Sequence, residues 1–143
     1  LYYCYAPIQD PEAYREEHHL FCIENGILGR IIIANEGLNG TVSGTKENCQ
    51  KYMDYVLADK RFKDTDFKVE KTDGHTFTKI HVRVKPEIVH SGLIEIDPNQ
   101  KTGIHLEPED FKKMKNDEDI VILDARSNYE HKLGKFKNAI TLN

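Results

Sequence analysis

The sequence predicts an α+β protein, with a small, mainly antiparallel sheet that carries two helices on one face and is followed by the start of an α/β domain. Three observations predict this architecture. Segments typical of strands and helices alternate as β-α-β-β-α-β, with one extra strand, over the first ninety or so residues. The composition then becomes polar after Lys85. A short apolar run of the kind found in parallel sheets follows at residues 120–123.

The first strand and the first helix are recognised by their ends. Residues 1–6 are rich in aromatic side chains, which is typical of a strand. Asp10 can cap a helix that has Pro11 at its first position. We expect that helix to end at the Asn-Gly pair, residues 25–26, because glycine accepts the left-handed conformation found there. Its apolar stripe consists of Tyr14, Phe21 and Cys22.

A hairpin and a second helix follow. Residues 28–34 contain three consecutive isoleucines and predict a buried strand. Residues 35–40 are a turn cluster, and residues 41–43 continue extended on its far side. Thr45 can cap the next helix. The apolar stripe of that helix fits helical spacing at every position and consists of Cys49, Tyr52, Met53, Val56 and Leu57.

Two more strands complete the first domain, at residues 67–69 and 79–85, with an Asp-Gly turn between them. The element order is that of the split βαβ, ferredoxin-like fold, in which both helices cover one face of the sheet. The other face of such a sheet is free for binding or chemistry.

The last strand predicts a row of cations on that free face. Side chains alternate across a strand, so its aliphatic residues point one way and its basic residues the other. The basic residues are Lys79, His81, Arg83 and Lys85. They stand about 7 Å apart and can match phosphates along a nucleic-acid backbone. An ordinary polar strand face is the alternative. The lack of an interleaved acidic residue and the net charge of −4 favour binding.

The loop at residues 35–44 is a second candidate site. Its glycines and its Asn, Thr and Ser side chains offer N–H groups and hydroxyls that can hold a phosphate or a flipped base. The structural alternative is a hairpin that needs positive φ at Gly37 and Gly40. The residues expected near a nucleotide are Asn35, Glu36 and Asn39, joined by Arg30 from the preceding strand.

Composition excludes several classes of protein. Uninterrupted apolar runs such as residues 31–34 are far too short to span a bilayer. The three cysteines include no C-x-x-C pair, which argues against a disulfide framework or a cysteine-based zinc site. The seven histidines show no short ligand spacing. We therefore expect a cytoplasmic protein with no membrane segment, no bound metal and no cofactor.

The second half begins with a connection, residues 91–107, so a domain boundary is expected near residue 91. Pro108 begins a short helix. Asp124 and Arg126 follow the apolar run at its carboxyl end, where open α/β sheets place functional loops.

Several stretches resemble a known family. The run that ends in Asp124-Ala125-Arg126, the pair Tyr129-Glu130 and the turn at residues 134–140 resemble the opening of a rhodanese domain. Lys135 stands where rhodaneses usually carry His. Residues 36–44 and 81–89 resemble signature stretches of the bacterial rhodanese-related tRNA uridine hydroxylases. The resemblance covers essentially the whole chain, and it implies a structural role in the rhodanese motif for Asp124, Arg126 and Glu130.

The resemblance implies a ferredoxin-like N-terminal domain at residues 1–90, a linker at 91–107 and the incomplete start of a rhodanese-like domain at 108–143. It implies hydroxylation of uridine at carbon 5, at the wobble position of tRNA, with tRNA as partner and molecular oxygen as co-substrate. The family's essential cysteine lies in a loop beyond Asn143. The chain is therefore expected to be an inactive fragment that can self-associate. The expected structural cysteines are Cys4, Cys22 and Cys49.

Two alternatives stay open: a sulfurtransferase that carries a cysteine persulfide, and a non-catalytic packing or dimerisation module. The ferredoxin-like order also resembles that of acylphosphatases, in which an Arg and an Asn, here Arg30 and Asn39, clamp a phosphoryl group. The Gly-rich loop that such chemistry needs is replaced by residues 7–11, Pro-Ile-Gln-Asp-Pro. We interpret that likeness as one of fold alone.

Overall fold

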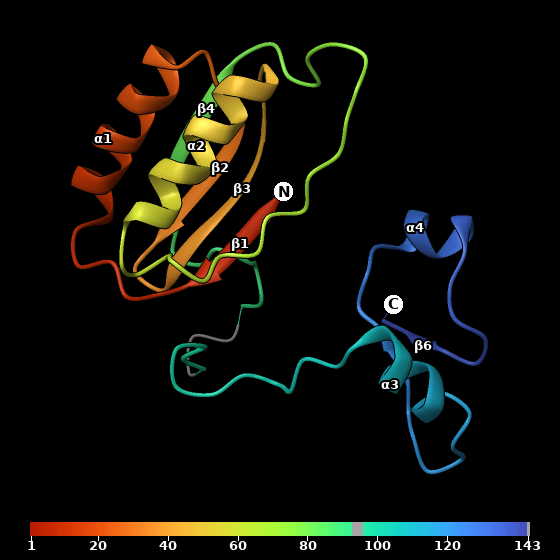
Figure 1. Cartoon of the computed structure of the whole chain (residues 1–143). Coiled ribbons are helices and arrows are strands. Elements are labelled where there is room, and N and C mark those ends of the chain that lie inside the picture. Colours follow the sequence, from red (N-terminus) through yellow and green to blue (C-terminus); the bar gives the residue numbers. More distant parts are fainter. Residues whose placement is uncertain (93–95, 143) are drawn as a thin grey trace. The chain divides into compact units, whose positions relative to one another are not determined.

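The computed structural model describes residues 1–92 and 96–142 and divides the chain into two compact units, Leu1–Thr102 and Gly103–Asn143. The division falls within the segment expected to be a linker. The first unit holds a four-stranded sheet with both long helices on one of its faces (Figure 1).

The sheet of the first unit has the order β1-β3-β2-β4. Its strands are β1 (Tyr2–Tyr5), β2 (Leu28–Ala34), β3 (Gly37–Ser43) and β4 (Ile80–Val84). Strand β3 is antiparallel to β1 and to β2, whereas β4 is parallel to β2. The α+β class and the ferredoxin-like placement of β1, β3 and β2 are confirmed. The sheet is mainly antiparallel, as predicted, with one parallel pairing where the extra strand β4 lies beside β2.

The strand predicted at residues 67–69 is wrong as an element, although this segment does lie at the β1 edge. Lys68 and Leu1 exchange two backbone hydrogen bonds, of 2.8 and 3.0 Å. One bonded pair is too little for a strand.

The two helices begin and end where the local signals predict. In α1 (Pro11–Glu24), the Asp10 carboxylate accepts a hydrogen bond from the Ala13 N–H at 3.0 Å, and Gly26 follows with φ +60°. In α2 (Lys46–Ala58), the Thr45 hydroxyl accepts one from the Asn48 N–H at 3.1 Å. Each cap satisfies a donor that the first turn of a helix leaves free.

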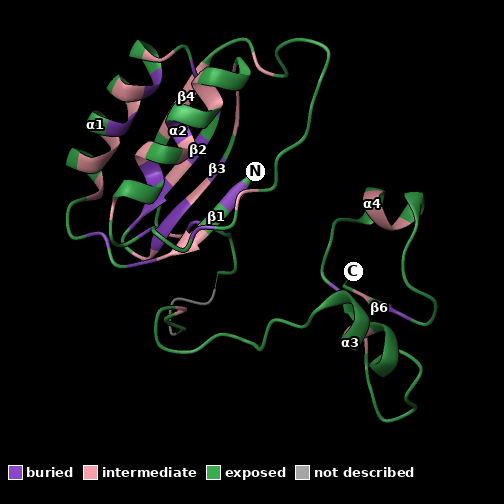
Figure 2. Cartoon of the chain, viewed as in Figure 1, coloured by how far each residue is buried: buried purple, intermediate pink, exposed green. Residues whose placement is uncertain are grey.

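The core lies between the helices and the sheet, where Figure 2 shows the buried residues. At its centre, the Tyr52 hydroxyl is hydrogen-bonded to the Tyr2 hydroxyl and, at 2.7 Å, to Nε2 of the fully buried His18. Gly40 lies under the Tyr2 ring, and a Cβ atom at that position would come within 2.5 Å of the hydroxyl oxygen. Glycine is therefore required at residue 40 by close packing rather than by a positive φ.

The second unit is small and largely exposed. It contains α3 (Pro108–Met114), β5 (Leu123–Asp124), α4 (Asn128–Leu133) and β6 (Ile140–Thr141), and β5 is parallel to β6. The helix predicted at Pro108 is confirmed. The strand predicted at residues 120–123 shrinks to Leu123–Asp124, and the apolar run is exposed, with Val121 at 73%. The strand β5 is short because β6, the strand with which it pairs, has only two residues.

Within the described residues, no helix is long and apolar enough to cross a membrane.

Candidate nucleic-acid interface

The sheet of the first unit has one face under the helices and one face turned away from them. On β4, Ile80 and Val82 pack against the core below the helices. His81 and Arg83 alternate with them and therefore point away. The predicted orientation of the basic row is confirmed.

Strand pairing brings a further cation to the row. His81 is the register partner of Arg30 on β2, so both side chains lie on the free face. Partial burial lowers the pKa of His81, and the positive charges of Lys79, Arg83 and Arg30, together with His19 on α1, lower it further. These groups are thus near enough to act on one another. We call the set the cationic patch, and it consists of Arg30, Lys79, His81, Arg83 and Lys85.

The described residues of the first unit do not neutralise the cationic patch. Over residues 1–92 and 96–142, no ion pair involves Arg30, Lys79, Arg83 or Lys85, and all four side chains are exposed. In a chain of net charge −4, these cations form a local positive surface suited to a polyanion.

The segment at residues 86–92, here called the strap, covers one end of the free face. The N–H group of Ile88 donates to the Glu36 carboxylate at 2.7 Å, and the Asn39 amide donates to the Ile88 carbonyl at 2.8 Å. The Asn35 amide donates to the Ile8 carbonyl at 3.1 Å. The residues predicted near a nucleotide in the hairpin loop therefore have partners within the chain. Their contact with RNA stays a prediction.

The phosphate cradle expected at residues 35–44 is wrong. Only Asn35 and Glu36 form the turn, while Gly37–Ser43 is strand β3, which pairs with β2 throughout and with β1 over its first four residues. Over residues 37–40 the ladders on both sides occupy the backbone groups that a phosphate would need, and over residues 41–43 they occupy those that face β2. Gly37 is explained by close approach, because a Cβ there would lie 2.2 Å from the Cys4 carbonyl oxygen.

The loop between β1 and α1 does not supply a phosphate cradle either. The N–H groups of Ala6 and Ile8 donate to the carbonyls of Glu36 and Asn35, each at 2.9 Å, and Pro7 has no N–H group. This geometry agrees with a likeness to acylphosphatases in fold rather than in chemistry.

The three cysteines are unpaired. Burial raises the pKa of the Cys22 thiol to about 12 and also raises that of Cys49. Cys4 lies on β1, with its Sγ 3.8 Å from the Tyr5 carbonyl. A nucleophilic cysteine needs the thiolate, which burial disfavours at Cys22 and Cys49. Within the described ranges, no three His, Cys, Asp or Glu side chains are placed to hold a metal ion.

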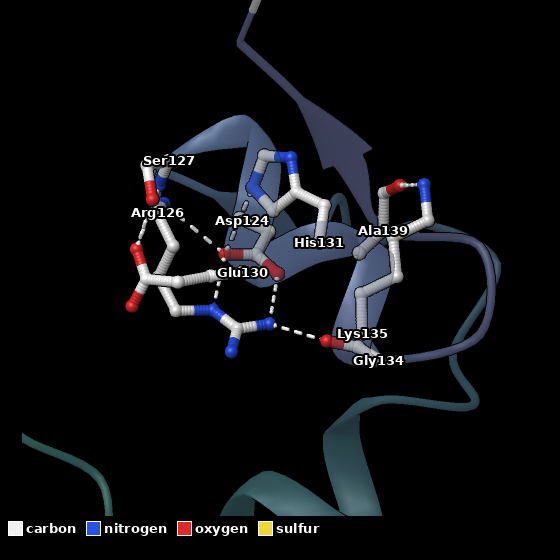
Figure 3. A network of polar contacts seen from close by, with 8 residues as sticks. All are labelled: Asp124, Arg126, Ser127, Glu130, His131, Gly134, Lys135 and Ala139. Carbon is white, nitrogen blue, oxygen red and sulfur yellow. Dashed lines mark hydrogen bonds and ion pairs between the residues drawn. The ribbon is translucent and has the colours of Figure 1, made fainter.

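The second unit contains a polar network around Asp124 (Figure 3). The Arg126 guanidinium donates to both carboxylate oxygens of Asp124, at 2.9 and 2.7 Å, and to the Gly134 carbonyl at 2.8 Å. This pairing holds the pKa of Asp124 well below its usual range. His131 Nε2 lies 3.5 Å from the same carboxylate.

A capping box and a lysine contact extend the network. The N–H group of Ser127 donates to the Glu130 carboxylate at 3.0 Å, at the start of α4. The Lys135 ammonium donates to the Ala139 carbonyl at 3.0 Å. Asp124, Arg126 and Glu130 therefore fix local backbone. Their role in a rhodanese motif stays a prediction.

The free face also carries two tyrosines that sequence reasoning did not single out. Tyr3 and Tyr5 alternate on β1 with the buried Tyr2, and Tyr3 is 60% exposed. Side chains alternate between the two faces of a strand, so a buried Tyr2 would have indicated that Tyr3 and Tyr5 lie on the other face.

Comparison with known proteins follows this geometry. Residues 1–88 match the family model described as "UPF0176 acylphosphatase like domain". Three curated relatives carry the name tRNA uridine(34) hydroxylase. The relative from Cytophaga hutchinsonii is 65% identical over 142 residues, which cover 99% of this chain and 46% of that protein. The relative from Oceanobacillus iheyensis is 52% identical, over 98% of this chain and 44% of that protein. The relative from Staphylococcus carnosus is 46% identical, over 100% of this chain and 45% of that protein. The chain thus spans a little under half the length of these relatives.

Proposed function

Because this chain belongs to the family described as "UPF0176 acylphosphatase like domain", we propose that it is part of a tRNA uridine hydroxylase whose first unit holds tRNA on its free sheet face. The observation that carries the proposal is the cationic patch, which lies opposite the helices and has no ion-pair partner among the described residues. Its members are the groups that bind phosphates in proteins.

The proposed reaction is hydroxylation of a uridine in tRNA at carbon 5, with molecular oxygen as co-substrate. The name shared by the relatives, which gives uridine at position 34, supports the substrate. The roles proposed for this chain are binding and positioning. Arg30, Arg83 and Lys85 hold phosphates, whereas Glu36 and Asn39 act by fixing the strap.

The reacting cysteine is proposed to lie outside these 143 residues. The raised thiol pKa values of Cys22 and Cys49 support this assignment, as does the greater length of the relatives. The tRNA substrate and the three unpaired cysteines support a cytoplasmic setting. Self-association of the chain stays a prediction, supported by exposed aliphatic side chains such as Ile104 and Leu133.

Mass spectrometry of tRNA nucleosides tests the activity. The full-length protein that contains this chain and the chain alone are each incubated with unmodified tRNA in air, and a matched reaction excludes oxygen. We expect uridine to gain one oxygen atom only with the full-length protein and only in air. A full-length protein that leaves uridine unchanged and transfers sulfur from thiosulfate to cyanide would establish the sulfurtransferase instead.

A further inference from the structure

We propose that the exposed ring of Tyr3 is a stacking site for an unpaired RNA base, placed across the sheet from the cationic patch. The inference rests on the proposed RNA-binding function and extends it, because it assigns a place to bases as well as to phosphates. It also specifies the class of RNA, which is single-stranded or looped rather than duplex.

Strand register places Tyr3 and Arg83 in one row across the free face. Tyr3 is opposite Asn39, Asn39 is opposite Ile32, and Ile32 is opposite Arg83. Register partners in a sheet point to the same face. Tyr3 and Arg83 are therefore three strand spacings apart, about 14 Å. The Asn39 amide in this row also holds the strap through the Ile88 carbonyl. The span is therefore suited to a short stretch of RNA that passes over the strap, with its backbone over β4 and its bases turned toward β1.

The exposure of Tyr3 is unusual for its strand. Tyr3 is 60% exposed, whereas the neighbouring Tyr2 is 2% exposed in the core. Tyr5 lies beside it, with ring centroids 6.1 Å apart and an interplanar angle of 71°. This edge contact restrains the Tyr3 ring without burying it. Exposed aromatic rings on an open sheet are the platforms on which single-stranded RNA bases stack.

Charge on the free face favours one orientation of the RNA. The cations lie on β2, on β4 and at the two ends of β4. At the other corner, burial raises the pKa of Tyr5, and the nearby carboxylates of Glu36 and Glu87 raise it further. Phosphates are attracted to the first region and repelled from the second. An RNA strand thus places its backbone toward β4 and leaves its bases for β1.

An unpaired base is required because a duplex does not present its base faces. In a paired RNA helix the bases are stacked on one another, and proteins contact mainly its phosphates and 2′-hydroxyls. A loop can turn a base out onto an aromatic ring. A flipped or unstacked base is also what chemistry on a uridine needs.

The test uses two RNA hairpins of identical stem, one with a normal loop and one whose loop nucleotides lack bases. Binding of each to the 143-residue chain is measured by fluorescence anisotropy over a range of salt concentrations. The variants are Tyr3→Leu, which removes the ring, and Tyr3→Phe, which keeps it. Tyr129→Leu is the matched control, since Tyr129 is an exposed tyrosine of the second unit.

The wild-type chain, Tyr3→Phe and Tyr129→Leu should each bind the hairpin with the normal loop at least fivefold more tightly than the hairpin with the baseless loop. A difference of this size is expected for one stacked base. Tyr3→Leu should lose that preference and keep its salt dependence, because no charge is removed. A Tyr3→Leu variant that keeps the full preference overturns the stacking site, while the proposed RNA binding stands. A wild-type chain that binds neither hairpin contradicts the RNA-binding function, and the stacking site with it.

Discussion

His18 shows how one buried residue couples the stability of the first unit to pH. It is fully buried, its Nε2 is bonded to Tyr52, and its Nδ1 has no hydrogen-bond partner among the described residues. Burial lowers the pKa of His18 to about 4, from 6.5 for an exposed imidazole. Between these values the unfolded chain binds a proton that the folded chain does not. Stability is therefore greatest above pH 6.5 and is lost as the pH falls toward 4.

We expect the free energy of unfolding of the first unit to fall by about 2 kcal/mol between pH 7 and pH 5 through His18 alone. Urea titrations at several pH values measure this dependence. His18→Leu should remove most of it, and His19→Leu, a change at the neighbouring half-buried position, should retain it. Equal slopes for the two variants would show that another group is responsible.

The strap is the element that makes the free face asymmetric. Ile88 is 1% exposed but does not belong to the core beneath the helices. Ala34, which shares the free face with Arg30 and Ile32, is also fully buried. The strap therefore adds a small apolar layer over the hairpin end of the sheet, and its hydrogen bond with Asn39 brings it to the row that joins Tyr3 and Arg83.

Ile88→Ala should destabilise the first unit by roughly 2–4 kcal/mol, since it leaves a cavity under the strap. Val89→Ala is the matched control, because Val89 is 49% exposed, and it should cost less than about 1 kcal/mol. Urea unfolding at pH 7 gives both values. Similar losses for the two variants would mean that the strap is not packed on the sheet.

Helices and strands could be predicted from the sequence where the residues that determine them lie close together in the chain. The caps at Asp10 and Thr45 and the glycine at residue 26 act within a few residues, and all three were predicted correctly. Strand partners depend on residues far apart in the chain. The sequence therefore did not indicate that β4 lies parallel to β2, or that residues 67–69 make one bonded pair with Leu1.

At the scale of the whole molecule, the candidate site was predictable in part. Alternation along one strand was sufficient to place Arg83 and its neighbours on the free face. The partners of Glu36 and Asn39 were not predictable, because the strap that binds them lies about fifty residues away. The buried place of His18 was missed, although it stands at helical spacing between Tyr14 and Cys22.

The central claim is that an acidic chain binds RNA phosphates through the cationic patch on its free sheet face. Each phosphate contact contributes to the slope of the logarithm of the affinity against the logarithm of the salt concentration. The slope is therefore a direct count of the charges in contact.

The most direct test is the salt dependence of tRNA binding by the chain in which Arg83→Ala and Lys85→Ala are combined. We expect weaker binding and a slope smaller in magnitude by about 1.4 to 1.8, which corresponds to the loss of two phosphate contacts. A control with Lys60→Ala and Lys63→Ala, which removes two exposed cations from the segment after α2, should keep the wild-type slope. Unchanged affinity and slope in the Arg83 and Lys85 variant would contradict the account.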